Sequence, residues 1–239
     1  MSKRCNQIHE QVQQVILEYL GYLKRSNWIH ENPRLLDIGC WEGVTTNVYA
    51  GKLGTKFQYG IEIFDEQIVK ARSRNVKVDK VDLERDKFPY KNDYFDIIIC
   101  NQVFEHLKQI FHPMDEILRT LKPGGFFVFS VPNLSSFHNR LMLLFGLQPS
   151  SIRIFGPHVR GFTYNSFVQY ATFSKNYKLI KSKGVGFYPL PAKPFGNLLG
   201  NIWKSGCHTP VLLLMKNVKN KDAVSWDYSI RRMNQQTLF

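Results

Sequence analysis

Two glycines and three acidic residues stand at intervals that fit a ligand site at the edge of a parallel sheet. Asp37 lies in an apolar run that leads into a turn with Gly39 and Gly43. Glycine lets a ligand lie against the backbone, because a Cβ at that place would collide with it. Glu62 ends the next apolar run, where a carboxylate can accept both hydroxyls of a ribose, and Asp82 follows the third run. The turn lacks the Gly-x-Gly-x-x-Gly pattern, which disfavours a nicotinamide dinucleotide.

A second set of residues could move protons or bind anions. His106 follows the fourth apolar run, and imidazole titrates near neutral pH, so His106 is a candidate general base. The alternative is that His106 and its neighbour Glu105 fix the loop by hydrogen bonds. His158 and Arg160 follow a Gly-Pro pair and form a second candidate, with His158 as base and Arg160 as an anion clamp. The alternative there is a structural turn whose Thr163 caps the next helix.

Strands that end at one edge are needed to bring these residues together. Apolar runs alternate with helical patterns, which predicts right-handed crossovers and a parallel, doubly wound sheet. The run before His106 is almost continuously apolar, as expected for a strand covered on both faces. Strands are predicted at about 34–38, 57–63, 76–81, 94–100 and 125–131, and helices at 8–24, 65–74 and 113–121.

The rhythm changes after Pro132. A helix over 134–147, a loop over 148–161 and a helix over 163–173 are expected, with the last two strands at 177–185 and 210–216. The stretch 186–206 between these strands is rich in Gly and Pro. One domain is therefore predicted over 1–217, with a cap at about 134–163 inserted after the fifth strand. A polar C-terminal tail is predicted over 218–239.

The ordered motifs resemble class I S-adenosylmethionine-dependent methyltransferases. They are Asp37-x-Gly39-Cys40-x-x-Gly43, Tyr59-Gly60-Ile61-Glu62, Asp82-Leu83, Phe95-Asp96-Ile97-Ile98-Ile99 and Leu121-Lys122-Pro123-Gly124-Gly125. The similarity covers about residues 33 to 133 and is greatest to the small-molecule branch that includes ubiquinone- and menaquinone-type enzymes. It implies an α/β, Rossmann-like, seven-stranded and mostly parallel sheet, with S-adenosyl-L-methionine as the cofactor.

The same resemblance implies roles for the turn after the first strand. Gly39 and Cys40 would lie against the methionine part of the cofactor, and Asp37 would orient its amino group directly or through water. Trp41 departs from the family, which usually carries a small residue there. Its ring would either cover the cofactor or point outward from the helix that begins after Gly43.

Roles after the later strands follow from the same resemblance. Glu62 would hold the ribose and Ile63 would pack on the adenine. Asp82 would accept from the adenine amino group while Leu83 donates a backbone N–H. Asn101 and Gln102 would line the methionine end and the entrance for the acceptor.

The segment from His158 to Thr163 resembles a His-x-Arg-x-Phe-Thr segment of the same branch, often linked to glycan or lipid-like acceptors. The longer segment from Leu134 to Thr163 lies after the fifth strand and is expected to close the acceptor pocket, with His158 and Arg160 facing the methyl group rather than the solvent.

Charge and cysteine usage set limits on partners. The net charge of +13 favours anions such as nucleic acid, phosphorylated metabolites or anionic lipid headgroups, or else serves solubility alone. Cys5, Cys40, Cys100 and Cys207 lie far apart, which argues against a zinc site and a disulfide framework. The apolar runs are too short to span a bilayer, so no stable membrane insertion is expected and the cytoplasm is the expected compartment.

Three functions remain open on these grounds. The first is methylation of an oxygen, or a carbon, of a small-molecule, glycan-precursor or lipid- or quinone-like acceptor. The second is an RNA methyltransferase, which the charge and the many aromatic residues favour. Against it, Asn101-Gln102-Val103-Phe104 replaces the Asn-Pro-Pro-Tyr type of tetrapeptide that base-N-methylating enzymes often carry. The third is a non-enzymatic S-adenosylmethionine-binding protein.

Overall fold

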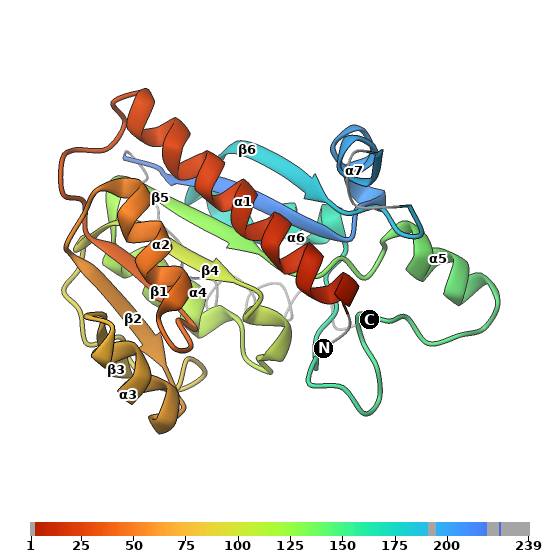
Figure 1. Cartoon of the computed structure of the whole chain (residues 1–239), viewed down its shortest axis with the longest axis horizontal. Helices are drawn as coiled ribbons and strands as arrows, with labels where there is room; N and C mark the ends of the chain where they lie inside the picture. Colours follow the sequence, from red (N-terminus) through yellow and green to blue (C-terminus); the bar gives the residue numbers. More distant parts are fainter. Residues whose placement is uncertain (1–2, 191–194, 219–224, 226–239) are drawn as a thin grey trace.

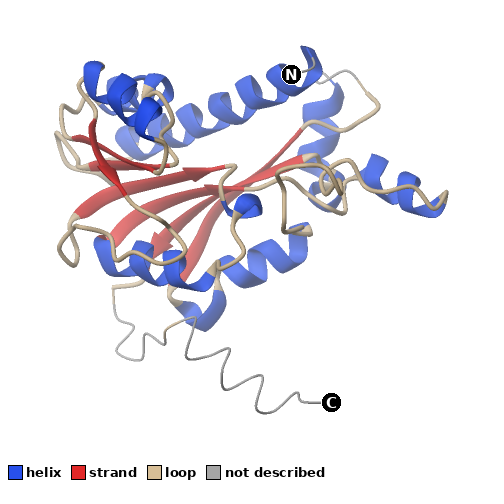
Figure 2. Cartoon of the chain, turned by 90° about the horizontal axis from the view of Figure 1, so that it is seen from below, coloured by secondary structure: helices blue, strands red, loops and turns tan. Residues whose placement is uncertain are grey.

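The chain folds into a seven-stranded sheet with helices on both faces (Figures 1 and 2). The computed structural model describes residues 3–190, 195–218 and 225. The strand order is β3-β2-β1-β4-β5-β7-β6. All pairs among β1 to β5 are parallel, whereas β7 runs antiparallel to both β5 and β6. This confirms the predicted mostly parallel α/β sheet. The strands are β1 (Leu35–Ile38), β2 (Gln58–Glu62), β3 (Lys77–Lys80), β4 (Phe95–Asn101), β5 (Leu121–Ser130), β6 (Tyr177–Val185) and β7 (Thr209–Lys216).

Seven α-helices of the described residues cover the sheet and its ends. Alternate residues of β4 face two different cores, because side chains alternate along a strand. Ile97 and Ile99 pack in the core that contains residues of α1 and α2, whereas Ile98 packs in the core that contains residues of α4 and α6. No helix among the described residues has the length and hydropathy needed to cross a membrane. The helices are α1 (Lys3–Arg25), α2 (Val44–Leu53), α3 (Asp65–Ser73), α4 (Phe111–Thr120), α5 (Phe137–Leu144), α6 (Tyr164–Ala171) and α7 (Asn197–Ile202).

The strand order reverses between β1 and β4, and this reversal positions the site. From β1 the chain builds outward through β2 and β3 on one side, and then returns to β4 on the other. A crevice opens at the carboxyl ends of the strands where such an order reverses, and ligands of open α/β sheets bind there. The acidic and glycine residues singled out above lie at or just beyond the carboxyl ends of β1, β2 and β3.

Several element boundaries differ from the sequence prediction, two of them near the site. The strand expected at 125–131 begins at Leu121, because Leu121 pairs with Phe95 of β4. The pairing register then shifts, and the Pro-Gly-Gly stretch of β5 is left unpaired before Phe126 pairs with Ile97. The helix expected over 134–147 is shorter, Phe137–Leu144.

The Gly- and Pro-rich stretch 186–206, for which the sequence predicted no helix or strand, contains α7. Gly200 of this helix packs directly on Gly184 of β6, and a Cβ on Gly184 would lie within van der Waals overlap of the Gly200 carbonyl oxygen. Glycine lowers helix propensity, so a helix that needs a glycine for close packing is hidden from the sequence pattern. The predicted tail 218–239 lies outside the described residues except for Val218 and Ser225.

Candidate functional site

A cavity of about 490 Å³ opens at the carboxyl ends of β1, β2 and β4. This volume is typical of a site for a small molecule or cofactor. Each wall comes from the residues that directly follow a strand, with one contribution from the cap. The walls include Gly39, Trp41, 61–64, 81–84, 102–103, 106–107 and Pro157.

Gly39 allows the sharp turn after β1. Its φ of 71° lies in the left-handed region, and a Cβ there would lie 2.6 Å from Cγ2 of Val103. Gly43, with a φ of 75°, begins α2 under similar constraints, since its Cβ would lie 2.9 Å from Cγ2 of Val76. Both glycines are therefore required by the turn itself, and only Gly39 lines the cavity.

Glu62 is the buried carboxylate of the cavity wall. Its Oε2 accepts from the Trp41 backbone N–H at 3.0 Å. Its Oε1 accepts from the N–H groups of Ile63 at 2.8 Å and Phe64 at 3.3 Å. A carboxylate has about four acceptor positions, so three backbone donors fix its orientation and leave capacity for a ligand hydroxyl. Glu62 thereby ties the β1 turn to the end of β2.

Asp37 and Cys40 lie behind this wall. Asp37 is buried at the end of β1, and its Oδ2 accepts from the Thr46 hydroxyl at 2.6 Å. Burial raises the pKa of Asp37 to about 7; the bond from Thr46 offsets part of that rise and nearby Glu62 adds to it. Cys40 is buried against Gly60, and neither Asp37 nor Cys40 lines the cavity.

Asp82 and Leu83 line the cavity after β3, as predicted for an adenine site. Oδ1 of Asp82 accepts from the Glu84 backbone N–H at 2.9 Å, and the Asp82 N–H donates to Oδ2 of Asp86 at 2.8 Å. These two bonds fold the segment into a turn that presents Leu83 to the cavity.

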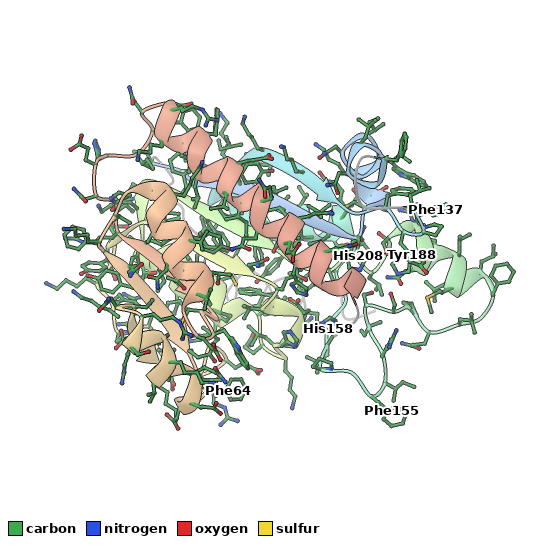
Figure 3. All side chains as sticks on the ribbon, in the orientation of Figure 1. Phe64, Phe137, Phe155, His158, Tyr188 and His208 are labelled. Carbon is green, nitrogen blue, oxygen red and sulfur yellow. The ribbon has the colours of Figure 1, made fainter. Side chains whose placement is uncertain are left out.

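Trp41 lies at the mouth of the cavity. Its backbone φ is 48°, unusual for a large side chain, and its ring meets Phe64 edge to face with 5.9 Å between the ring centres. Both rings are more than half exposed, and both line the cavity. The Trp41 ring therefore lies at the edge of the cavity, and its predicted role in covering the cofactor stays a prediction. Phe64 is labelled in Figure 3.

Asn101 and Gln102, the two site residues predicted at the end of β4, differ in whether they line the cavity. Gln102, with a φ of 57°, lines the cavity. Asn101 does not, because its Oδ1 accepts from the Ser130 hydroxyl at 2.5 Å on the neighbouring strand. Asn101 thus holds β4 to β5, and Gln102 alone reaches the predicted entrance.

His106 and His158 meet where the cap reaches the cavity. Their ring centres lie 4.8 Å apart. Nδ1 of His106 lies 3.2 Å from the Pro157 carbonyl oxygen, and Nδ1 of His158 lies 2.8 Å from that of Ser151. A carbonyl can only accept, so Nδ1 carries the proton in each ring and each Nε2 keeps a free lone pair. His106 lines the cavity and His158 stands behind it.

Glu105 lies beside His106 and His158. It is buried, and neither carboxylate oxygen has a hydrogen-bond partner among the described residues. Burial raises the pKa of Glu105 to about 8, so the carboxyl is largely protonated at neutral pH. The backbone carbonyl of Glu105 accepts from the N–H groups of Val159 at 2.9 Å and Arg160 at 3.1 Å. The loop is therefore fixed by the main chain of Glu105 rather than by its side chain.

Glu105, His106 and His158 each offer a ligand-type atom, and these atoms lie within 4.8 Å of one another. Such a group can hold a metal ion or move a proton. The sequence argument against zinc rested on the cysteine spacing and did not include these three residues.

Arg160 lies in the cap and outside the cavity wall. Its Nη2 donates to the Lys108 backbone carbonyl at 2.6 Å, and its Nε is buried without a partner among the described residues. Arg160 therefore fastens the cap to the segment after His106, and its role as an anion clamp stays a prediction. Thr163 caps α6 as expected, its hydroxyl accepting from the Ser166 N–H at 3.3 Å.

Sequence reasoning missed part of the wall. Phe64, Glu84, Val103 and Leu107 line the cavity, and each lies one or two residues from a predicted site residue. Their positions just beyond strand ends were the available signal. Pro157 also lines the cavity, and the preceding Gly-Pro pair had marked its segment.

Comparison with known proteins identifies the family. A model of the methyltransferase domain matches residues 6–171. The chain belongs to this methyltransferase domain family. S-adenosylmethionine, the predicted cofactor, is the cofactor of the class I methyltransferases in it.

The curated relatives match over a limited stretch. A probable S-adenosylmethionine-dependent methyltransferase of Mycolicibacterium smegmatis is 28% identical over 103 residues, which are 43% of this chain and 39% of the relative. The 27-O-demethylrifamycin SV methyltransferase of Amycolatopsis mediterranei is 29% identical over 103 residues, 41% of this chain and 38% of the relative. The matched stretch is about two fifths of the length of either relative.

Solved structures share the fold. A Thermotoga maritima S-adenosylmethionine-dependent methyltransferase, described as a possible histamine N-methyltransferase, matches with a TM-score of 0.58. It is 19% identical, and the match covers 90% of this chain and 94% of that one. At this identity the likeness shows the fold alone, and it agrees with the predicted Rossmann-like architecture.

Proposed function

We propose that this chain is an S-adenosylmethionine-dependent methyltransferase that methylates an oxygen of a small acceptor, such as a glycan precursor or a lipid- or quinone-like molecule. One observation carries the proposal. His106 lines the cavity with its Nδ1 proton held by the Pro157 carbonyl, so a basic Nε2 is available beside it. Burial lowers the pKa of His106, which keeps the ring neutral and able to accept a proton at neutral pH.

The cavity residues fit the cofactor. Glu62 offers a fixed carboxylate to ribose hydroxyls, and Ile63 and Leu83 offer apolar surfaces to an adenine ring. Gly39 leaves the backbone open at the methionine end. When bound, S-adenosylmethionine supplies a methyl group on a positively charged sulfur that is already activated for displacement.

The chain itself then has two tasks at the acceptor side. Val103, Leu107 and Pro157 offer the acceptor apolar surface beside His106. Nε2 of His106 accepts the proton that the acceptor hydroxyl loses. The His158 ring packs against the His106 ring, with 4.8 Å between the ring centres. Alignment of acceptor and cofactor supplies most of the remaining rate, as is usual when the leaving group is activated.

The experiment is incubation of the full chain with cofactor labelled in its methyl group and a fractionated cell extract. We expect label in a lipid or glycan-precursor fraction, stable to mild base as an ether is. Label in RNA would overturn the proposed acceptor class. Binding of the cofactor without transfer of label to any fraction would overturn the proposal that the chain is an enzyme. A run with EDTA separates the two chemistries of the Glu105–His106–His158 group: unchanged transfer supports the base, whereas loss that a divalent cation restores replaces it by a metal-assisted step.

A further inference from the structure

Large apolar side chains are exposed together at one end of the molecule. They belong to three segments, residues 141–147 at the end of α5 and beyond, residues 152–155 of the following loop, and residues 195–203 around α7; we call these the apolar end. Phe155 is fully exposed, Ile154 is 81% exposed and Leu144 is 75% exposed. Soluble monomers rarely leave a large group of such side chains in water unless the surface binds something.

The three segments are held together by contacts at their bases. Arg140 of α5 donates to the Ser205 carbonyl at 2.9 Å, and its guanidinium lies 5.2 Å from the ring centre of Trp203. The amide of Asn139 and Nε2 of His138 bond the hydroxyls of Ser151 and Ser150 at the start of the loop. In Figure 1, α5, α7 and the loop after α5 lie at the end of the molecule far from α3. Figure 3 shows Phe155 projecting outward from that end.

The part of the sequence that contains the apolar end has no acidic residue. Between Glu116 and Asp222 the sequence has no acidic residue, and every residue charged at neutral pH in that stretch is Lys or Arg. The stretch contains the entire apolar end, with Arg140 and Arg153 exposed among its apolar side chains. The net charge of +13 is therefore concentrated in the half of the chain that carries the exposed apolar residues.

We propose that the apolar end docks on an anionic lipid bilayer. Aliphatic and aromatic side chains enter the headgroup boundary, while Lys and Arg bind the lipid phosphates. Trp203 and Tyr188, half-exposed at the base of the apolar end, are of the type that lies at the level of the headgroups. RNA fits less well, since Leu144, Ile154 and Ile202 cannot stack on bases as aromatic rings do. An anionic bilayer presents phosphates over its whole surface, which suits basic residues that lie among exposed apolar ones.

Docking also places the cavity near the bilayer. Pro157, which lines the cavity, follows Phe155 by only two residues, and its carbonyl holds His106. A loop whose tip enters the lipid would therefore have its base at the acceptor side of the cavity. This step rests on the proposed function: the acceptor would be a molecule that resides in the membrane. The docking itself does not depend on catalysis.

Flotation of the full chain with vesicles tests the docking. One set of vesicles is phosphatidylcholine, and the other replaces a third of it by phosphatidylglycerol. We expect binding to the anionic vesicles and a fall of about tenfold or more in apparent affinity for the Ile154→Ser/Phe155→Ser variant. The matched control is Val69→Ser on α3, an exposed apolar residue far from the apolar end. Arg153→Gln should weaken binding about fivefold, as for one basic side chain at an anionic surface, whereas exposed Lys56→Gln should not.

The outcomes separate the alternatives. Absence of flotation with anionic vesicles overturns the proposal, as does equal binding by the chain and the double variant. Tighter binding to a single-stranded RNA than to anionic vesicles, unaffected by the double substitution, overturns it in favour of RNA. S-adenosylmethionine binding is measured on the same samples, and both substituted residues are exposed, so it should be unchanged. A chain that floats but binds no cofactor supports docking and overturns the proposed function.

Discussion

The cofactor cavity and the apolar end differ in how their residues are held. At the cavity, polar side chains are fixed by main-chain partners: the Glu62 carboxylate accepts from three backbone N–H groups, and Asp82 is bonded on both sides of its turn. At the apolar end, the side chains that project furthest, such as Phe155 and Leu144, make their contacts with solvent. The first arrangement selects one ligand by geometry, and the second suits a broad surface.

The two regions also differ in the sign of their charged residues. Acidic residues at the end of β2 and after β3, Glu62 and Asp82, line the cavity, whereas the half of the chain that follows α4 has no acidic residue up to Asp222. His106 and Pro157 form the junction between the two regions. We therefore expect substitutions in the cofactor cavity to affect cofactor binding, and substitutions at the junction of His106 and Pro157 to affect turnover.

The largest effect is expected at Glu62. Glu62→Ala should weaken S-adenosylmethionine binding by about 2–4 kcal/mol, because the ribose loses charged hydrogen bonds and three N–H groups lose their acceptor. Isothermal titration calorimetry measures it, with Glu66→Ala on the exposed face of α3 as the control that should change nothing. An unchanged dissociation constant would remove Glu62 from the ribose site.

The junction is tested by His106→Ala. We expect kcat to fall about a hundredfold while cofactor affinity is kept, as for a lost acid–base group. Burial lowers the pKa of His106 below its ordinary 6.5, with His158 adding to the effect. Turnover should therefore be constant at and above neutral pH and fall only in acid, once the ring is protonated. His112→Ala, which removes an exposed ring bonded to the Asp86 carbonyl, is the control. An acid limb above pH 6.5 would contradict this assignment.

Glu105 provides a test that depends on stability alone. Burial raises its folded pKa to about 8, above the ordinary value of an unfolded glutamate. The folded state then binds more protons, so the unfolding free energy falls as pH rises from about 4.5 to 8. Glu105→Gln abolishes that titration, and the variant should gain at least about 1 kcal/mol relative to the parent between pH 5 and 8. Urea unfolding at both pH values measures it; a constant difference would show that Glu105 is ionised in the folded state.

The sequence predicted the sheet well, and it singled out several residues that line the cavity, for a physical reason. Asp37, Gly39, Glu62 and Asp82 act through backbone geometry at strand ends, which leaves a fixed spacing in the sequence. Asn101 was expected to line the methionine end, but its Oδ1 is bonded to the Ser130 hydroxyl, whereas its neighbour Gln102 lines the cavity.

The acceptor side was predicted less well because its contacts are long-range. The bond between Arg160 and the Lys108 carbonyl, and that between His106 and the Pro157 carbonyl, join segments about fifty residues apart. No local spacing encodes such pairs. The exposure of the apolar end is equally invisible, since the pattern of α5 alone reads as a helix that packs on a core.

The smallest effect concerns Trp41, where two contributions oppose each other. Trp41→Gly relieves a left-handed backbone conformation that costs a bulky residue about 1 kcal/mol, and it loses an edge-to-face contact with Phe64 that contributes about 0.5–1.5 kcal/mol. Unfolding stability should therefore change by less than about 1 kcal/mol. If the ring covers the ligand, cofactor affinity falls several-fold, and Phe64→Ala lowers it similarly. In a double-mutant cycle the combined loss should be smaller than the sum, because either substitution breaks the ring pair. Gain of stability with unchanged affinity would place the Trp41 ring outside the site.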